Sequence, residues 1–400
     1  MKVAQVNVVY QKGSTGKIVY DLHTMLQENN FESIVCYGRK EMGLQENVYK
    51  ISSEIEAKFH ALYSRISGYG YTSSYFATKK LIQVLKTEKP DVVNLHCING
   101  YFINIYNLLN FLKKNKIATV LTLHAEFMHT GGCGHAYDCN KWKTGCGACP
   151  QLKDATHSLY FDRTAEQWEM MKSSFENFEN LKIIAVSNWL KNRAEMSPIL
   201  AGKEFHVIGN GIDTKNIFKP VSFASLKEKH QLKNDKIVLY VSPSFKSLSK
   251  GGRFISELAQ RLSKENIVFI VVGFDDDESV LPKNIIGVRH TKDQKELAKY
   301  YSMADVTVLT SKRETFSMVC AESLASGTPV VGFKAGAPEE IALKQFSEFV
   351  NFGEVNELEK VLLKWLKKDK KCFQELSELA KKEYSRELMF EKYLDIYNQF

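Results

Sequence analysis

The sequence lacks any apolar segment of the roughly 20 residues that a helix needs to cross a bilayer. Its first residues, Met1–Tyr10, read as a strand and have no long apolar core of the kind found in signal peptides. No internal repeat and no low-complexity tract is visible, which argues against repeat folds and disordered linkers. We therefore expect a cytosolic protein, with peripheral contact at the inner face of the membrane as an open alternative.

The bulk composition is that of a packed globular protein. Hydrophobic residues make up 44% and charged residues 25% of the 400 positions, enough for two domains of ordinary size. The net charge of +8 is a mild excess. It fits contact with an anionic membrane or with phosphorylated substrates, and it requires neither.

Short β-branched runs alternate with helical patterns along almost the whole chain, as expected of parallel strands buried on both faces. The expected strands are Val3–Tyr10, Ile34–Tyr37, Val92–His96, Ala118–His124, Ile183–Val186, His206–Ile208, Ile237–Val241, Ile267–Val272, Ile285–Val288, Val306–Thr310 and Val330–Phe333. They predict an α/β protein with two doubly wound sheets. We place the domains at residues 1–212 and 213–385, followed by a charged helical tail that begins near Gln374 and whose last part is residues 386–400.

The segment Arg313–Gly332 carries two glutamates, Glu314 and Glu322, around a turn and an apolar helix. Eight positions are a little over two helical turns, so both carboxylates can lie on one face, one at the helix mouth and one within the helix. An ionised carboxylate only accepts hydrogen bonds and can take two from a vicinal diol, which suits hydroxyl recognition. For the spacing alone, an ordinary helix with two solvated glutamates is the alternative.

The flanks of these glutamates resemble a known family. Glu-Thr-Phe-Ser before the helix and Ala-Ser-Gly-Thr-Pro-Val-Val after it resemble the nucleotide-sugar site of family 4 glycosyltransferases, and Gly209–Asp213 resembles their interdomain hinge. The resemblance covers nearly the whole chain. It implies the GT-B fold, in which two Rossmann-like doubly wound parallel-sheet domains face a cleft, and a C-terminal helix that crosses back to the first domain.

The resemblance also implies a reaction. It is the transfer of a sugar from a UDP- or GDP-linked donor to a hydroxyl acceptor, with retention of configuration at the anomeric carbon. The reaction needs no catalytic metal. The family's commonest acceptor is lipid-linked or an oligosaccharide, in surface polysaccharide or lipopolysaccharide assembly. Glu322 is then expected to hold the ribose, while Glu314 and His124 act at the donor sugar. The donor-binding residues implied are Gly13, Gly16, Lys246, Lys250, Thr315, Phe316, Ser317 and Glu322.

Two helix mouths are candidate diphosphate ligands. Gly13–Lys17 follows the first strand and opens a helix, which offers backbone N–H groups to an anion, with a simple tight turn as the alternative. It is no Walker loop, because its glycine spacing is too short. Lys250 opens a later helix. The family's arginine ahead of it is missing, so either Lys246 or Arg253 would have to replace it, and lysine cannot reproduce a bidentate contact.

Two histidines close neighbouring strands. His96 and His124 follow Asp91–Leu95 and Ala118–Leu123, at the ends where open α/β sheets bind ligands, although a lone histidine there is usually structural. Family members often place an aspartate after the second histidine. Here Ala125 and Glu126 follow it, which leaves the hydrogen-bonding partner of His124 open.

Four cysteines cluster in the insertion Glu126–Leu152, namely Cys133, Cys139, Cys146 and Cys149. Four thiols ending in a C-x2-C pair suit a closed structural zinc site that braces the insertion. Two disulfides or redox pairs, and reduced packing thiols, are the alternatives. A zinc-knuckle nucleic-acid binder is disfavoured because no basic and aromatic stripe accompanies the cluster, so we expect no nucleic-acid partner.

Three further interpretations stay open or weak. A dinucleotide-dependent oxidoreductase would need a proper G-x-G-x-x-G with an acidic residue about 20 positions on, and none is present. A catalytically inactive sugar-binding homologue is the alternative that the missing arginine leaves open. The segment Lys58–Leu85 mixes aromatics and lysines; we favour a core-facing helix there, with membrane contact as the alternative.

Overall fold

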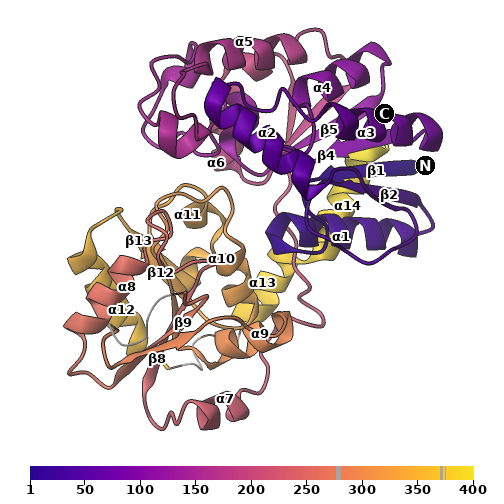
Figure 1. Cartoon of the computed structure of the whole chain (residues 1–400). Coiled ribbons are helices and arrows are strands. Elements are labelled where there is room, and N and C mark those ends of the chain that lie inside the picture. Colours follow the sequence, from indigo (N-terminus) through magenta and orange to yellow (C-terminus); the bar gives the residue numbers. More distant parts are fainter. Residues whose placement is uncertain (276–280, 370–372, 374) are drawn as a thin grey trace. The chain divides into compact units, whose positions relative to one another are not determined.

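The computed structural model describes residues 1–275, 281–369, 373 and 375–400 (Figure 1). It divides into two compact units. Unit 1 consists of residues 1–209 and 390–400, and unit 2 of residues 210–389. The first boundary, between residues 209 and 210, lies three residues before the expected one. The second boundary, between residues 389 and 390, falls within the last helix of the chain. No helix among the described residues has the length and apolar character to cross a bilayer.

Unit 1 is built on a seven-stranded parallel sheet in the order β3-β2-β1-β4-β5-β6-β7. Its strands are β1 Lys2–Asn7, β2 Glu32–Tyr37, β3 Val48–Lys50, β4 Val92–Leu95, β5 Ala118–Leu123, β6 Leu181–Ala185 and β7 Glu204–Val207. Its helices are α1 Gly13–Glu28, α2 Glu54–Ser67, α3 Tyr75–Glu88, α4 Ile105–Lys114, α5 Thr164–Phe175 and α6 Asn188–Glu195. The β-branched strand residues are buried, because helices carry the crossovers between parallel strands.

Unit 2 repeats the plan with six parallel strands in the order β10-β9-β8-β11-β12-β13. Its strands are β8 Lys236–Val241, β9 Ile267–Val272, β10 Ile285–Val288, β11 Val306–Leu309, β12 Val330–Phe333 and β13 Ser347–Val350. Its helices are α7 Ala224–Lys229, α8 Gly252–Arg261, α9 Gln294–Met303, α10 Met318–Ala325, α11 Pro338–Ile341, α12 Val355–Leu366 and α13 Leu376–Tyr384. The last helix of the chain, α14 Arg386–Tyr397, belongs mostly to unit 1.

The expected α/β class and all eleven expected strands are present, each within about three residues of its expected ends. The sequence missed β3 and β13, two edge strands of three and four residues with only half-buried side chains. The tail was also expected to be one helical stretch. It breaks at Ser385, because the Ile212 N–H donates to Tyr384 O and Arg386 N–H donates to Ile212 O. Gln374 lies outside the described residues.

Helix α14 covers a row of buried polar side chains on the sheet of unit 1. Tyr397 Oη accepts hydrogen bonds from Gln5 Nε2 (3.2 Å) and Asn94 Nδ2 (2.7 Å). Thr122 Oγ1 donates to Asn94 Oδ1 (3.0 Å) and accepts from Tyr393 Oη (3.2 Å). All five residues are buried, so each polar group depends on the others for its partner.

We predict that Tyr397→Phe destabilises unit 1 by about 2 kcal/mol, because it leaves two buried amide donors without their acceptor. For a unit of this size the melting temperature should fall by about 4 °C or more in scanning calorimetry. The control is Tyr160→Phe, since Tyr160 is exposed. Equal melting temperatures for the wild type and Tyr397→Phe would contradict the network.

Candidate active site

Both sheets have a point where the chain reverses its direction of winding. In unit 1 the chain runs outward from β1 to β3 and then returns to place β4 on the other side of β1. In unit 2 it runs from β8 to β10 and returns with β11 beside β8. The crevice at the carboxyl ends of such strands is where open α/β sheets bind ligands. The candidate residues follow these strands in both units.

In unit 2 the structure brings Lys250 and Glu314 together. Lys250 Nζ lies 2.6 Å from Glu314 Oε1, and both side chains are less than one-third exposed. The main chain under the lysine is held by Tyr240 Oη, which donates to Lys250 O (3.0 Å), and by Thr310 Oγ1, which donates to the same oxygen (3.1 Å). A fixed ammonium group thus stands where α8 begins.

Gly251 makes this placement possible. It is the N-cap of α8 with φ of 75°, and a Cβ there would lie 2.2 Å from Thr310 O. Any other residue would be strained and would clash with backbone, so the close approach of α8 to the end of β11 needs glycine.

Glu314 lies outside helix α10, which begins four residues later at Met318. Glu322 lies within the helix as expected, whereas Glu314 precedes the N-cap residue Ser317, so helical spacing does not decide whether the two carboxylates share a face. Instead, Glu314 is fixed by its backbone, which donates to Ala335 O (2.9 Å) and accepts from Ala337 N–H (3.1 Å) after β12. Glu314 and Glu322 occupy different settings: the first pairs with a cation, and the second is buried in α10.

Glu322 is 8% exposed and accepts a hydrogen bond from Tyr301 Oη of α9 at 2.9 Å. Burial raises its pKa to about 7, against the opposing effect of the Tyr301 hydrogen bond. Nothing in the sequence singles out Tyr301, whose position in α9 looks like an ordinary apolar one. Tyr301 occupies one carboxylate oxygen, and no described residue donates to the other.

The turn before α10 is buried and carries a strained residue. Thr315, Phe316 and Ser317 are all less than one-tenth exposed. Ser317 has φ of 87°, which is unfavourable for any residue with a Cβ, and its Oγ accepts from the Cys320 N–H (3.3 Å) as the N-cap of α10. Strain of this kind costs on the order of 1–3 kcal/mol and persists only where the surroundings hold it, typically at ligand sites.

The two substitutes for the missing arginine are placed differently. Arg253 stacks on Phe254, with 4.7 Å from its guanidinium carbon to the ring centre. It lines a pocket with Asp235 and Asn266, which precede β8 and β9 at the opposite edge of the sheet. Lys246 lies in the loop after β8, where its N–H donates to Asp275 (3.3 Å). Lys246 is therefore the better-placed of the two.

In unit 1 the glycine-rich segment forms the first turn of α1. Gly13 has φ of 67°, and a Cβ on Gly16 would lie 3.2 to 3.3 Å from Val9 and Gln11, so both positions favour glycine. No side chain caps the helix, and its first turn carries no acidic residue. These features suit an anion, although nothing in the geometry requires one.

His96 and His124 meet at the carboxyl edge of the same sheet. Their rings stack at 5.4 Å, with His96 Nδ1 3.1 Å from His124 Nε2 and His96 Nε2 2.7 Å from Gln5 Oε1. Burial lowers the pKa of His124 to about 4 and that of His96 well below its ordinary value, so both are neutral at pH 7. His96 is the partner that the sequence left open for His124.

The hydrogen bonds fix the tautomers of this pair. The Gln5 amide donates to Tyr397, so its oxygen accepts from His96 Nε2–H. His96 Nδ1 then carries no proton and accepts from His124 Nε2–H. Neutral His124 therefore has an unprotonated Nδ1, which can accept a hydrogen bond. Gln5 and Asn94, polar residues within apolar strand runs, are the signal that sequence reasoning overlooked.

Glu126 follows His124 by two positions, close to where family members often have an aspartate. Its role in this structure is structural. It is fully buried, with Arg193 Nε donating to Oε1 (2.6 Å) and Ala136 N–H donating to Oε2 (2.9 Å). Burial alone would raise its pKa, but His129, Arg193 and the Ala136 N–H outweigh it and lower the pKa to about 2. An ionised Glu126 thus ties the cysteine-rich insertion to α6.

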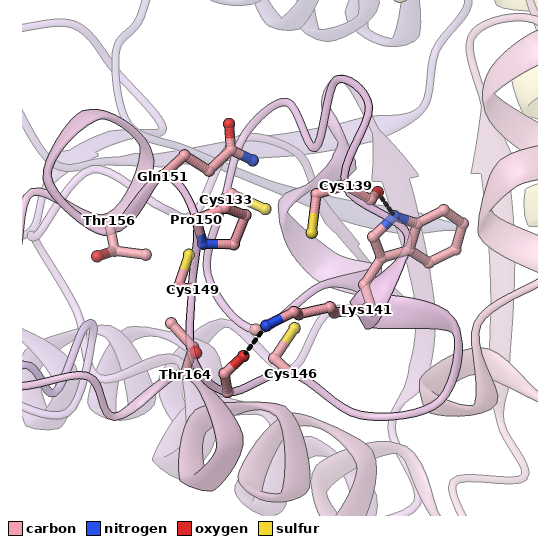
Figure 2. A pocket seen from close by; sticks show the side chains of 12 residues that line it. Cys133, Cys139, Lys141, Cys146, Cys149, Pro150, Gln151, Thr156 and Thr164 are labelled. Atoms are coloured by element: carbon pink, nitrogen blue, oxygen red, sulfur yellow. Dashed lines mark hydrogen bonds between the residues drawn. The ribbon is translucent and has the colours of Figure 1, made fainter.

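The four clustered cysteines line one pocket. Figure 2 shows the sulfur atoms of Cys133, Cys139, Cys146 and Cys149 around a common space. All described cysteines are free, so none of the described thiols forms a disulfide. As placed, however, no group of three or more described side chains is arranged as the ligands of a metal ion. The zinc site stays a prediction from the sequence.

The loop around the C-x2-C pair is held by backbone contacts. Lys141 Nζ, whose side chain Figure 2 shows beside the cysteines, donates to Gly147 O (3.0 Å). It also donates to Ala148 O (2.6 Å). Gly147 and Ala148 both have positive φ, of 121° and 43°. A Cβ on Gly131 would lie 2.8 Å from Cys146 Sγ, so the segments approach as closely as they can.

Family models match both halves of the chain. The model described as Glycosyltransferase Family 4 matches residues 15–216, half of the chain, and the model described as Glycosyl transferases group 1 matches residues 222–383. The chain belongs to glycosyltransferase family 4. The family that the sequence suggested is thereby confirmed.

Relatives of the chain agree with this placement. It is 21% identical, over 99% of both chains, to an Escherichia coli (strain K12) protein assigned to colanic acid biosynthesis as the glycosyl transferase WcaC. HepE of Anabaena, solved with UDP-glucose, has a TM-score of 0.67 at 16% identity over 100% of both chains. WaaG, described as a glycosyltransferase involved in lipopolysaccharide biosynthesis, has a TM-score of 0.66 at 15% identity, covering 98% and 99%. These structures show the GT-B fold.

Elemental analysis tests the zinc prediction. Protein purified without chelators should contain one zinc per chain, because four thiolates can complete a tetrahedral shell. Cys146→Ser should lower the zinc content, while Cys97→Ser, outside the pocket, should leave it unchanged. A wild-type protein without zinc would contradict the prediction and leave the four residues as reduced packing thiols.

Proposed function

We propose that the protein is a retaining glycosyltransferase that takes a sugar from a nucleotide-diphosphate donor bound by unit 2. The observation that carries the proposal is the constellation at the carboxyl ends of β8 and β11. A fixed lysine at a helix mouth, a glutamate paired with it, and a buried glutamate about one turn into α10 stand in a chain that belongs to family 4.

Lys250 is the proposed diphosphate ligand. In the transfer, the bond between the anomeric carbon and the diphosphate oxygen breaks, and a bond to the acceptor oxygen forms on the same face. The acceptor proton passes to the departing diphosphate, which keeps the bond electrons. Charge therefore grows on the diphosphate, and a preorganised ammonium group stabilises it without reorganisation. Lys246 would add a second, less directional charge.

The two glutamates suit two sets of hydroxyls. Glu322 has one oxygen held by Tyr301 and the other available to a ribose diol, which would bind its ionised form. Glu314 is held by backbone on both sides and is the proposed contact to the donor sugar, sharing Lys250 with the phosphates. In unit 1, neutral His124, positioned by its contact with His96, is the proposed contact to the donor sugar near the transfer point.

Relatives support a proposal for the donor base and the acceptor. HepE was solved with UDP-glucose, so we propose a UDP-linked donor, with GDP as the alternative to be tested. The names of WcaC and WaaG point to surface polysaccharides and lipopolysaccharides, so we propose a lipid-linked glycan as the acceptor, met at the inner membrane face. A non-catalytic nucleotide-sugar binder is the second candidate, favoured by the absent arginine.

Calorimetric titration with UDP and GDP tests the donor site. We expect the wild type to bind UDP with micromolar affinity. Glu322→Ala should weaken this affinity at least tenfold, because two hydrogen bonds to a charged group are worth about 1.5 kcal/mol or more. Glu383→Ala, an exposed glutamate on α13, is the matched control. Failure to bind either nucleotide would overturn the proposal. Binding without sugar transfer to any acceptor would support the non-catalytic candidate.

The pH dependence of UDP binding tests the role of Glu322 separately. Its pKa of about 7 lies above the ordinary carboxyl value, so the ionised form dominates above pH 7 and is lost as the pH falls. If the ribose binds the ionised form, affinity should fall by up to about tenfold per pH unit below 7. Titrations between pH 6 and pH 8 should show this slope in the wild type and lose it in Glu322→Gln. The titration of UDP itself appears in both proteins.

A further inference from the structure

Helix α2 of unit 1 carries its apolar side chains on the outside. Ile55, Phe59, Leu62, Tyr63 and Ile66 are all exposed, by 68%, 67%, 52%, 47% and 47%. At 100° per residue they cover a stripe about 100° wide along the whole helix. The interpretation of this segment as a core-facing helix is therefore wrong for α2.

The inner face of α2 is small and polar. Its buried residues are Ala57, His60 and Ser64, on the side of the helix opposite the stripe. His60 Nδ1 lies 2.7 Å from Ser74 Oγ, and its Nε2 accepts from the Ser73 N–H (3.2 Å). This is the reverse of a helix that packs by its apolar face. Polar contacts hold α2 in place and leave its apolar face outward.

Two neighbouring segments extend the stripe into one apolar band. At the first turn of α2, Glu56 accepts from the Ala77 N–H (3.1 Å), which places exposed Tyr75 and Phe76 beside the helix. At its last turn, Leu159 N–H donates to Arg65 O (2.8 Å). The ten exposed members of the apolar band are Ile55, Phe59, Leu62, Tyr63, Ile66, Tyr75, Phe76, Leu159, Tyr160 and Phe161.

The charged side chains beside the apolar band that form no ion pair with a described residue are basic. Lys58, Arg65 and Lys79 are exposed, and none of them forms an ion pair with a described carboxylate. The acidic residues of α2 are both engaged: Glu54 pairs with Arg39 (2.9 Å), and Glu56 accepts from the backbone of α3. Free cations beside exposed aromatic and aliphatic side chains are the pattern of helices that lie in the interface of an anionic membrane.

We propose that the apolar band is a membrane-docking surface, which seats unit 1 on an anionic lipid bilayer with α2 lying in the plane of the interface. The convex helix offers no groove for a peptide, and a band this large is unusual on a surface that meets only water. The tyrosines suit the headgroup level, where a ring can be buried while its hydroxyl stays wet.

The surface lies at the edge of the sheet that carries the histidine pair. Helix α2 is tied to Arg39 and Lys40, which follow β2, and His60 contacts Tyr101, which follows β4. The carboxyl ends of parallel strands share one edge, where His96 and His124 also lie. A bilayer on this surface would present lipid-linked hydroxyls toward that edge. This role in presenting the acceptor rests on the proposed function, whereas the docking itself does not.

Vesicle flotation of the full chain tests the proposal. The probes are vesicles of phosphatidylcholine alone and of phosphatidylcholine with about one-third phosphatidylglycerol. We expect the wild type to float with the anionic vesicles. Phe59→Ser/Leu62→Ser should lower the partition coefficient by at least about tenfold, because each substitution removes apolar area from the interface. Lys58→Gln/Arg65→Gln/Lys79→Gln should weaken binding to anionic vesicles only.

Met196→Ser is the matched control, since Met196 is 53% exposed on unit 1 but outside the apolar band. It should float like the wild type. If Phe59→Ser/Leu62→Ser does not fold, Phe76→Ser, whose side chain is 77% exposed, takes its place. UDP binding, measured in parallel, should be equal in all variants, so that loss of docking and failure of the donor site are distinguishable.

Three results would overturn the proposal. The first is that the wild-type protein remains in the vesicle-free fraction when anionic vesicles are present. The second is flotation of Phe59→Ser/Leu62→Ser equal to that of the wild type. The third is a concentration-dependent dimer that the substitutions abolish while vesicles have no effect, which would make the apolar band an interface between two copies of this chain.

Discussion

The constraint on which the rest of the structure depends is the parallel arrangement of the strands. Parallel strands need crossovers, and the crossovers put every strand's carboxyl end at one edge of its sheet. Where the winding reverses, beside β1 and β4 in unit 1 and beside β8 and β11 in unit 2, that edge opens. In unit 1 the glycine-rich turn and the two histidines follow strands at this edge, and in unit 2 Lys250 follows β8, so within each unit their placement is a consequence of topology and not of any local motif.

Burial gives the two units opposite electrostatic characters. In unit 1, desolvation keeps His96 and His124 neutral, and a directional chain of hydrogen bonds from Gln5 fixes which nitrogen carries the proton. In unit 2, Lys250 and Glu314 form a charged pair, and burial brings the pKa of Glu322 to about 7. A neutral imidazole can form a hydrogen bond with a hydroxyl group, whereas a fixed ammonium group can bind phosphate. This division of labour fits a reaction in which charge develops on a leaving diphosphate.

Helix α2 shows how stability and function are separated in unit 1. Most helices here are held by an apolar face against a sheet, whereas α2 is held by His60, Ser64 and Ser74 and leaves its apolar residues outside. Leaving such residues in water forgoes roughly 1.5–3 kcal/mol for each side chain that could have been buried. That unused free energy becomes available when a bilayer covers the apolar band.

The sequence by itself determined the α/β class, the eleven expected strands, the family and the clustering of four cysteines, because all of these depend on local periodicity or on near neighbours. The tertiary structure decided what distant residues do together. Pairing of Lys250 with Glu314, Tyr301 with Glu322, and His96 with Gln5 depends on strand order, which periodicity does not encode. The same reason explains α2: its 3.6-residue pattern marks one apolar face, and only the packed fold decides whether that face turns inward or outward.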